Sequence, residues 1–229
     1  MRASFLAVIA GILLAAGYVG LALACLYQRG TPVPWSHVDA FSGGFLALMA
    51  VAIPVDLAAG LGRAVLRSPQ ILREASGMTY DPATLVLLGF LGAGDMLVFL
   101  DYGHWHLVPS LVHPGPQVLG LALAASASAW LVWVDARLAR HFTTAPVARI
   151  MIEDGPFRYV RHPRYAGLLA TRIALALALA SLAGWLLALV WSLVLLRRIR
   201  LEERHLEAVF GAAYDVYAQR TARLIPGVY

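Results

Sequence analysis

The stretch "AGLLATRIALALALASLAGWLLALVWSLVLL", residues 166–196, contains one charged residue, Arg172. As a single helix it would be about 46 Å long, well beyond the roughly 30 Å hydrocarbon core of a bilayer. A single helix would also place the arginines before and after it on opposite sides of the membrane, against the positive-inside rule. A turn near Ser181–Gly184 removes both conflicts. We therefore predict a helical hairpin over 165–200, with flanking arginine side chains reaching the membrane interface.

The composition of the whole chain predicts a polytopic membrane protein. Its 229 residues are 60% hydrophobic and 14% charged, whereas a soluble domain has about 25% charged residues. Four further apolar segments approach the roughly 20 residues that one crossing needs. They are Ala3–Tyr27, Phe41–Gly62, Ala83–Leu100 and Gln117–Val134. The predicted fold is an all-α membrane protein with about six transmembrane helices, of which the last two form the hairpin.

The chain divides into two regions by its polarity. Residues 1–134 hold the first four predicted helices, and residues 135–229 hold a polar loop, the hairpin and a polar tail. In the tail, Leu206, Val209 and Phe210 recur at helical spacing and so mark an apolar face. We expect a C-terminal amphipathic helix that lies along the inner face of the membrane.

The distribution of arginine predicts the orientation in the membrane. All 18 basic residues are arginine, and they concentrate in the second and fourth loops and in the tail, while the first and third loops are poor in arginine. The positive-inside rule then places both termini in the cytoplasm. This rule also accounts for the net charge of +5, so a nucleic-acid partner is not expected. The arginine-, alanine- and leucine-rich composition is typical of a bacterial inner-membrane protein, and the single cysteine excludes an internal disulfide.

The hairpin brings polar residues that are distant in sequence to one cytoplasmic rim. His162 and Tyr165 enter the hairpin, and Glu202 and Glu203 leave it. Pro163 disfavours the α conformation at His162, the residue before it. An imidazole, a phenol, two carboxylates and several guanidinium groups beside an apolar bundle suit a charged cofactor and an amphiphilic substrate, because buried charges must be paired.

The segments on either side of the hairpin resemble a known enzyme family. "GPFRYVRHPRYAG" (155–167) and "RIRLEERHLEAVFGAAYDVYAQRTARLIPG" (198–227) are similar to the C-terminal catalytic region of the isoprenylcysteine carboxyl methyltransferases. Phospholipid N-methyltransferases and methanethiol S-methyltransferases share the scheme RHPxYxG … EE … G…Y…Y … P. The resemblance covers 155–227, about a third of the chain. It implies a membrane-embedded methyltransferase that uses S-adenosylmethionine on a lipophilic acceptor, with residues 135–229 as the catalytic region.

The resemblance also implies roles for individual residues. The cofactor contacts that it implies are Tyr159, His162, Pro163, Tyr165, Gly167, Glu202 and Glu203. In this resemblance the two glutamates hold the amino and ribose groups of the cofactor, and His162, Tyr165 and Gly167 lie against its methionine and sulfonium part. The catalytic residues that it implies are Arg220, Glu203 and Arg161. Arg220 occupies the place of an arginine that faces the substrate carboxylate. No metal is expected.

The chemistry of the acceptor favours a carboxylate. An α-carboxylate, with a pKa of about 3.5, is ionised near neutral pH, whereas an amine with a pKa near 10 must first lose a proton. Carboxyl methylation therefore needs cationic positioning, while amine or thiol methylation needs a base or a shifted pKa. The arginine-rich rim favours an isoprenylcysteine-like carboxylate. A phospholipid ethanolamine group and a thiol remain alternatives, and the sequence does not indicate an oligomeric state.

Two carboxylates inside predicted membrane helices suggest a different class of function. Asp56 and Asp95 are either a structural polar pair or ligand contacts, because intramembrane carboxylates are costly. Together with the helix breakers Pro54 and Gly60, they make a small transporter the more distant alternative. No internal repeat supports it. A helper protein that keeps the fold without turnover is a third possibility.

Two groups of aromatic and imidazole side chains have simpler interpretations. Tyr214 and Tyr217 are expected to pack the tail onto the membrane surface. The third predicted loop contains three histidines that could ligate a metal, on the face opposite the proposed site: His104, His106 and His113.

Overall fold

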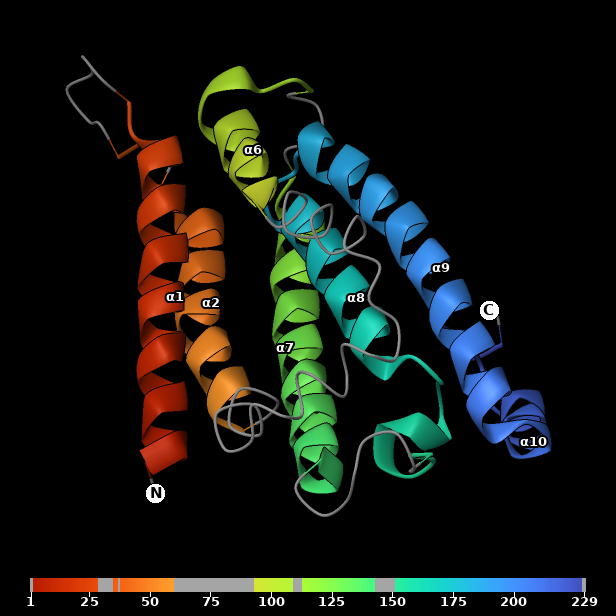
Figure 1. The fold of residues 1–229 in the computed structure, drawn as a ribbon. Coiled ribbons are helices and arrows are strands. Elements are labelled where there is room, and N and C mark those ends of the chain that lie inside the picture. Colours follow the sequence, from red (N-terminus) through yellow and green to blue (C-terminus); the bar gives the residue numbers. More distant parts are fainter. Residues whose placement is uncertain are drawn as a thin grey trace.

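The computed structural model describes residues 2–28, 35–36, 38–59, 93–108, 113–142 and 151–227. Their helices are α1 (Arg2–Leu26), α2 (Ala40–Ala59), α6 (Asp95–Leu100), α7 (Pro114–Phe142), α8 (Pro163–Ala178), α9 (Leu182–Phe210) and α10 (Ala212–Arg220). A π-helical turn, η1 (Asp101–Trp105), follows α6, and a 3₁₀ turn, η4 (Gly155–Arg158), precedes α8. Figure 1 shows the long helices side by side in one bundle. The predicted all-α class is confirmed.

Four of the described helices are long and apolar enough to cross a membrane. They contain the segments Phe5–Leu26, Ala40–Ala59, Pro114–Arg140 and Leu182–Phe210. The predicted first and second spans agree with α1 and α2, and α7 extends beyond the predicted fourth span at both ends. Most of the predicted third span, 83–92, and the loop 63–82 lie outside the described residues. The total of about six crossings therefore stays a prediction.

The outer surface of the bundle is apolar, as lipid requires. Leu13 is 67% exposed, and Leu119 and Leu193 are each 60% exposed. The interior is built from a separate set of apolar side chains, with Phe45 and Phe99 among the most deeply buried. An exposed apolar surface of this kind would be unfavourable in water. With the four apolar helices, it identifies an integral membrane protein.

The predicted hairpin is confirmed, and its turn lies where the sequence placed it. Ser181 is the N-cap of α9, and its hydroxyl accepts a hydrogen bond of 3.1 Å from the Gly184 amide. Ala180 turns the chain in the left-handed region, at φ 46°. Asp101 of η1 accepts hydrogen bonds from the Ser181 hydroxyl, at 2.5 Å, and from the Ala183 amide, at 3.1 Å. The turn is thus anchored to the end of the bundle that carries η1.

Helix α7 holds α8 along its length. A Cβ atom at Gly120 would collide with the backbone of Ala178, so the two helices approach closely there, as small residues allow in membrane bundles. At the other end of α8, the Trp130 indole donates a hydrogen bond of 2.7 Å to the Pro163 carbonyl. The two contacts hold both ends of α8 against α7, and the second one fixes its start, where the predicted site lies.

The polar tail differs from the prediction in one respect. Leu206, Val209 and Phe210 do not belong to a separate amphipathic helix, because α9 continues without interruption to Phe210. With 29 residues, α9 is about 44 Å long, which is longer than the roughly 30 Å hydrocarbon core. The helix ends only at Gly211, which adopts φ 54°. In Figure 1, α10 follows at the end of the bundle where the N-terminus also lies.

Candidate active site

The loop before α8 and the tail after α10 pair through their backbones. The Arg161 amide donates to the Ala222 carbonyl at 2.8 Å, and the His162 amide donates to the Arg223 carbonyl at 3.2 Å. Val160 and Ala222 form a parallel bridge. Residues about 60 positions apart are thereby fixed against each other beside the start of α8.

Glu203 is the centre of this junction. It is 5% exposed. Its Oε1 accepts hydrogen bonds of 3.0 Å from Nε of both Arg161 and Arg223, and its Oε2 lies 2.8 Å from a terminal nitrogen of Arg223. The His162 Nε2 lies 3.4 Å from Oε1. The buried carboxylate is therefore compensated by cations from the loop and from the tail, as burial of a charge demands.

Arg161 has a second structural contact. Its guanidinium also donates to the carbonyls of Ala218 and Thr221, each at 2.5 Å. These carbonyls lie at the C-terminal end of α10, where a cation is favoured by the helix dipole. Arg161 therefore links the loop, α9 and α10.

The rim next to Glu203 is formed by His162, Tyr165 and Glu202. His162 has φ −120° and ψ 59°, outside the α region, as Pro163 predicts. Its ring stacks on Tyr165, with ring centroids 5.7 Å apart and planes 19° apart. Its Nδ1 lies 3.9 Å from Glu202 Oε2. The predicted meeting of the two ends of the hairpin is therefore confirmed.

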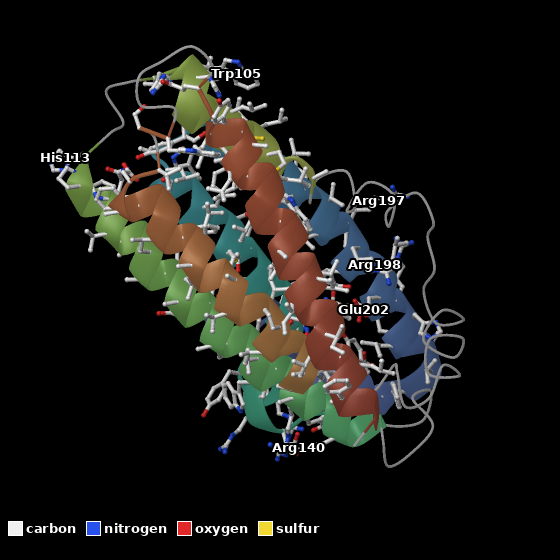
Figure 2. The ribbon with its side chains drawn as sticks, turned by 90° about the vertical axis from the view of Figure 1, so that its left-hand side faces the viewer. Trp105, His113, Arg140, Arg197, Arg198 and Glu202 are labelled. Atoms are coloured by element: carbon white, nitrogen blue, oxygen red, sulfur yellow. The ribbon has the colours of Figure 1, made fainter. Side chains whose placement is uncertain are left out.

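One oxygen of Glu202 has no hydrogen-bond partner among the described residues. This atom, Oε2, is buried, although the side chain as a whole is 35% exposed. Tyr165, which lies between the hairpin legs, accepts a hydrogen bond of 3.4 Å from Arg198 Nε. Glu202 thus retains capacity to accept hydrogen bonds, whereas both oxygens of Glu203 are already paired. Figure 2 shows Glu202 and Arg198 along the same stretch of α9.

The two tail tyrosines pack the tail onto the loop. Tyr214 and Tyr217 are 1% and 4% exposed, and the Tyr217 hydroxyl donates to the Phe157 carbonyl at 2.8 Å. Burial raises the pKa of both phenols, and the charge of Glu203 raises the pKa of Tyr214 further. Both therefore stay neutral. The expectation that they pack against the membrane surface is wrong, because the protein itself covers them.

Three predicted site positions have other neighbours. Tyr159 is 57% exposed. The Arg220 side chain is 61% exposed and pairs with Glu153. Gly167 faces α7, where an added Cβ would lie 2.7 Å from a methyl carbon of Leu131. Five of the predicted site residues therefore lie together: Arg161, His162, Tyr165, Glu202 and Glu203. Tyr159, Arg220 and Gly167 lie outside this group.

The sequence interpretation missed Arg223 and left Arg164 open. Arg223 reaches Glu203 only because the tail pairs with the loop, and no spacing rule indicates such a contact. Arg164 Nε donates to both carboxylate oxygens of Asp135 on α7, at 2.9 and 3.2 Å. Arg164 therefore belongs to the contact between α7 and α8.

The three histidines of the third predicted loop lie away from this group. Figure 2 shows His113 and Trp105 towards one end of the bundle and Arg140 towards the other. Among the described residues, no cluster of three or more potential metal ligands is found.

An apolar groove lies next to the rim. It is a cavity of about 290 Å³ between α8, α9 and the tail. Leu169 is one helical turn beyond Tyr165, and Leu224 directly follows Arg223, so two lining residues of the groove adjoin residues of the polar group. Arg200 is the charged residue among its lining side chains, which are Leu169, Ser192, Leu195, Leu196, Arg200, Leu224 and Ile225.

Comparisons with known proteins agree with this arrangement. Residues 116–213 match the model of a family described as "Phospholipid methyltransferase". Over 81 residues, the chain is 33% identical to protein-S-isoprenylcysteine O-methyltransferase of Schizosaccharomyces pombe. That match covers 34% of this chain and 33% of the yeast protein, so the chain spans about a third of the length of the curated relative it matches.

The fold comparison extends over more of the chain. A solved structure of the eukaryotic intramembrane Ras methyltransferase, isoprenylcysteine carboxyl methyltransferase, is similar with a TM-score of 0.56 and 17% sequence identity. The similarity covers 93% of this chain and 75% of the other. Residues 116–213 are therefore similar to the phospholipid methyltransferase family, and the fold is similar to that of isoprenylcysteine carboxyl methyltransferase.

Proposed function

We propose that the protein is an integral membrane methyltransferase that uses S-adenosylmethionine to methylate a lipophilic acceptor, with an isoprenylcysteine-like carboxylate as the preferred one. The observation that carries the proposal is the meeting of His162, Tyr165 and Glu202 at the start of α8, with an apolar groove whose lining begins one helical turn further along α8, at Leu169. A polar site for a charged donor and an apolar groove for a lipid chain are the two parts that such a reaction needs.

The residues at the rim fit the cofactor chemically. S-adenosylmethionine carries an ammonium group, ribose hydroxyls and a sulfonium, and Glu202 Oε2, which accepts no hydrogen bond from the described residues, can accept from the first two. The stacked rings of His162 and Tyr165 offer aromatic faces that attract a cation. The bound cofactor would supply the reactive methyl group. The protein would bind and orient the cofactor and provide the electrostatic environment of the reaction. In this proposal, Glu203 holds the loop and the tail together through its ion pairs with Arg161 and Arg223.

The groove supports a lipophilic acceptor with an anionic end. Its leucine side chains can contact an apolar chain, and the exposed Arg200 can pair with a carboxylate. Such a carboxylate is already ionised at neutral pH, so it needs orientation rather than a base. Arg220, paired here with Glu153, and Tyr159, Pro163 and Gly167 keep the roles that the family resemblance implies as further proposals.

The division of the chain follows from the same proposal. Residues 1–134 form the membrane scaffold, and residues 135–229 carry the site. We place the site and both termini in the cytoplasm, and the chain in a bacterial inner membrane. The support is the arginine asymmetry of the loops and the position of Trp105 at the opposite end of the bundle from Arg140.

Methyl transfer from a labelled donor tests the function. The full chain, purified in a nonionic detergent, is incubated with methyl-labelled S-adenosylmethionine and, separately, a farnesylated cysteine analogue, phosphatidylethanolamine or a small thiol. We expect label on the farnesylated carboxylate, released as methanol by mild base. Transfer only to the amine or only to the thiol would replace the proposed acceptor. Absence of both transfer and cofactor binding would refute the function and reopen the transporter and helper alternatives.

A further inference from the structure

Three ionisable side chains from three helices meet beside the start of α8. Asp135 of α7 is 2% exposed, and its two oxygens accept hydrogen bonds from Arg164 Nε at 2.9 and 3.2 Å. Asp56, in the last turn of α2, shares a side-chain hydrogen bond with Asp135 and interacts with the charge of Arg164. Figure 1 shows α7 between α2 and α8. The network therefore links α2 to the turn of α8 that carries the proposed site.

The hydrogen bond between the two carboxyl groups determines which of them is charged. Two carboxylates in contact repel each other, so one of the two acids keeps a proton and donates it. Asp135 is the ionised partner, because both of its oxygens accept from the guanidinium of Arg164. Asp56 is then the neutral donor. Asp95, which lines the same cavity as Asp56, pairs with Arg172, so the two carboxyl groups within the membrane helices have different partners and the charges balance.

Two residues of α7 hold the first turn of α8. The Trp130 indole donates to the Pro163 carbonyl at 2.7 Å, and Asp135, five positions further along α7, accepts from Arg164. The two contacts are made to consecutive residues of α8. One contact fixes the backbone of this turn, and the other fixes a side chain of it.

This turn also carries the rings of the proposed site. His162 directly precedes the two held residues and Tyr165 directly follows them, and the two rings stack with centroids 5.7 Å apart. A displaced turn would move both rings relative to Glu202, whose Oε2 lies 3.9 Å from His162 Nδ1. Misplacement of a reacting group by about 1 Å can cost about a hundredfold in rate, so the contacts behind a site must hold it accurately.

We propose that Asp135, supported by a neutral Asp56, is a positioning residue for the methyl-transfer site. Asp56 donates to Asp135, Asp135 orients Arg164, and Arg164 fixes the turn between His162 and Tyr165. The proposal rests on the proposed function and deepens it, because it gives α2 a part in the site: this helix supplies the donor that completes the network. The three side chains act through the rings of the rim and not on the reacting atoms.

A reporter inside the turn tests the positioning without any ligand. The indole N–H of Trp130 contacts Pro163, so its NMR resonance reports the place of the turn. The resonance is measured on the full chain with ¹⁵N-labelled tryptophan in maltoside micelles, and Trp130→Phe assigns it. Asp56→Leu should shift the resonance, because it removes the donor to Asp135 without a change of charge. Asp56→Asn should leave it in place, because the amide group still donates.

Cofactor binding tests the consequence for the site. We expect the Kd for S-adenosylmethionine, from calorimetry, to weaken about tenfold in Asp135→Asn and about threefold in Asp56→Leu, in line with the loss of a charged and of a weaker hydrogen bond. Asp56→Asn should bind like the wild type. Met49→Leu conserves volume and lies on α2 in the wall of the same cavity, so this matched control should change neither measurement. Thermal unfolding verifies that each variant is folded.

The comparison of the two Asp56 variants decides the outcome. Equal responses of Asp56→Leu and Asp56→Asn in both measurements would overturn the proposal, because the donor would then have no role. A shifted Trp130 resonance with an unchanged Kd in Asp56→Leu would also overturn it, because the network would then serve the fold alone. If the wild type binds no S-adenosylmethionine, the proposed function fails, and the indole resonance still decides whether Asp56 and Asp135 hold the turn.

Discussion

At the scale of single residues, the adjacent glutamates Glu202 and Glu203 differ in burial and in hydrogen bonding. Glu203 is buried and its oxygens are occupied by Arg161 and Arg223, whereas Glu202 is partly exposed and its Oε2 accepts no hydrogen bond from a described residue. Burial and pairing suggest a structural role for the first, and the free acceptor suggests ligand contact for the second. The sequence pair "EE" alone does not distinguish these roles.

Substitution of each glutamate by glutamine should separate stability from cofactor binding. Glu203→Gln leaves two arginines without their carboxylate, and breaking a buried ion pair costs about 3–5 kcal/mol, so we expect a clearly lower Tm. Glu202→Gln should keep the Tm and weaken the Kd for S-adenosylmethionine about tenfold. Thermal unfolding and calorimetry measure the two effects, with the exposed Glu207→Gln as the control. An unchanged Tm in Glu203→Gln would contradict the structural role.

A second substitution decides between two roles of Gly167. In the structure, a methyl group at this position would lie 2.7 Å from Leu131, and overpacking of this kind costs about 1–3 kcal/mol. We expect Gly167→Ala to lower the Tm, and Leu131→Ala in the same chain to restore part of the loss. If Gly167 instead contacts the cofactor, Gly167→Ala will weaken cofactor binding at an unchanged Tm, and Leu131→Ala will not rescue it.

At the scale of elements, the turn of the hairpin is held by a helix cap that is itself anchored. The Ser181 hydroxyl accepts from Gly184 and donates to Asp101. Loss of an N-cap side chain costs about 1 kcal/mol, so Ser181→Ala should lower the free energy of unfolding by at least this amount. Ser126→Ala is the matched control, because its hydroxyl is exposed and bonds within α7. Equal effects of the two changes in thermal unfolding would show that the cap is not important.

The hairpin could be predicted from the sequence, whereas the course of the tail could not. The length of the apolar run and the arginines at both ends leave a turn as the simplest solution. The end of α9 carries no comparable signal, because a change from apolar to polar residues does not stop a helix, and the helix ends only at Gly211. The Arg223–Glu203 contact depends on backbone pairing between distant segments, which no local pattern specifies.

At the scale of the whole molecule, the arginine distribution predicts which end of the bundle faces the cytoplasm. The chain has one cysteine, Cys25, so a Cys25→Ser background allows single reporter cysteines. In cells, His106→Cys should react with a membrane-impermeant maleimide from outside, and Asp215→Cys should react only after permeabilisation. The reverse pattern would place the proposed site outside the cell and contradict the proposed orientation.

The pairing of the loop with the tail also sets an order of events during synthesis. The described helices up to α9 can enter the membrane as they are made, but Glu203 acquires Arg223 only after translation has passed residue 223. The bundle and the site are therefore completed at different times. A ribosome that stops before residue 223 would release a chain that is inserted in the membrane but lacks a finished site.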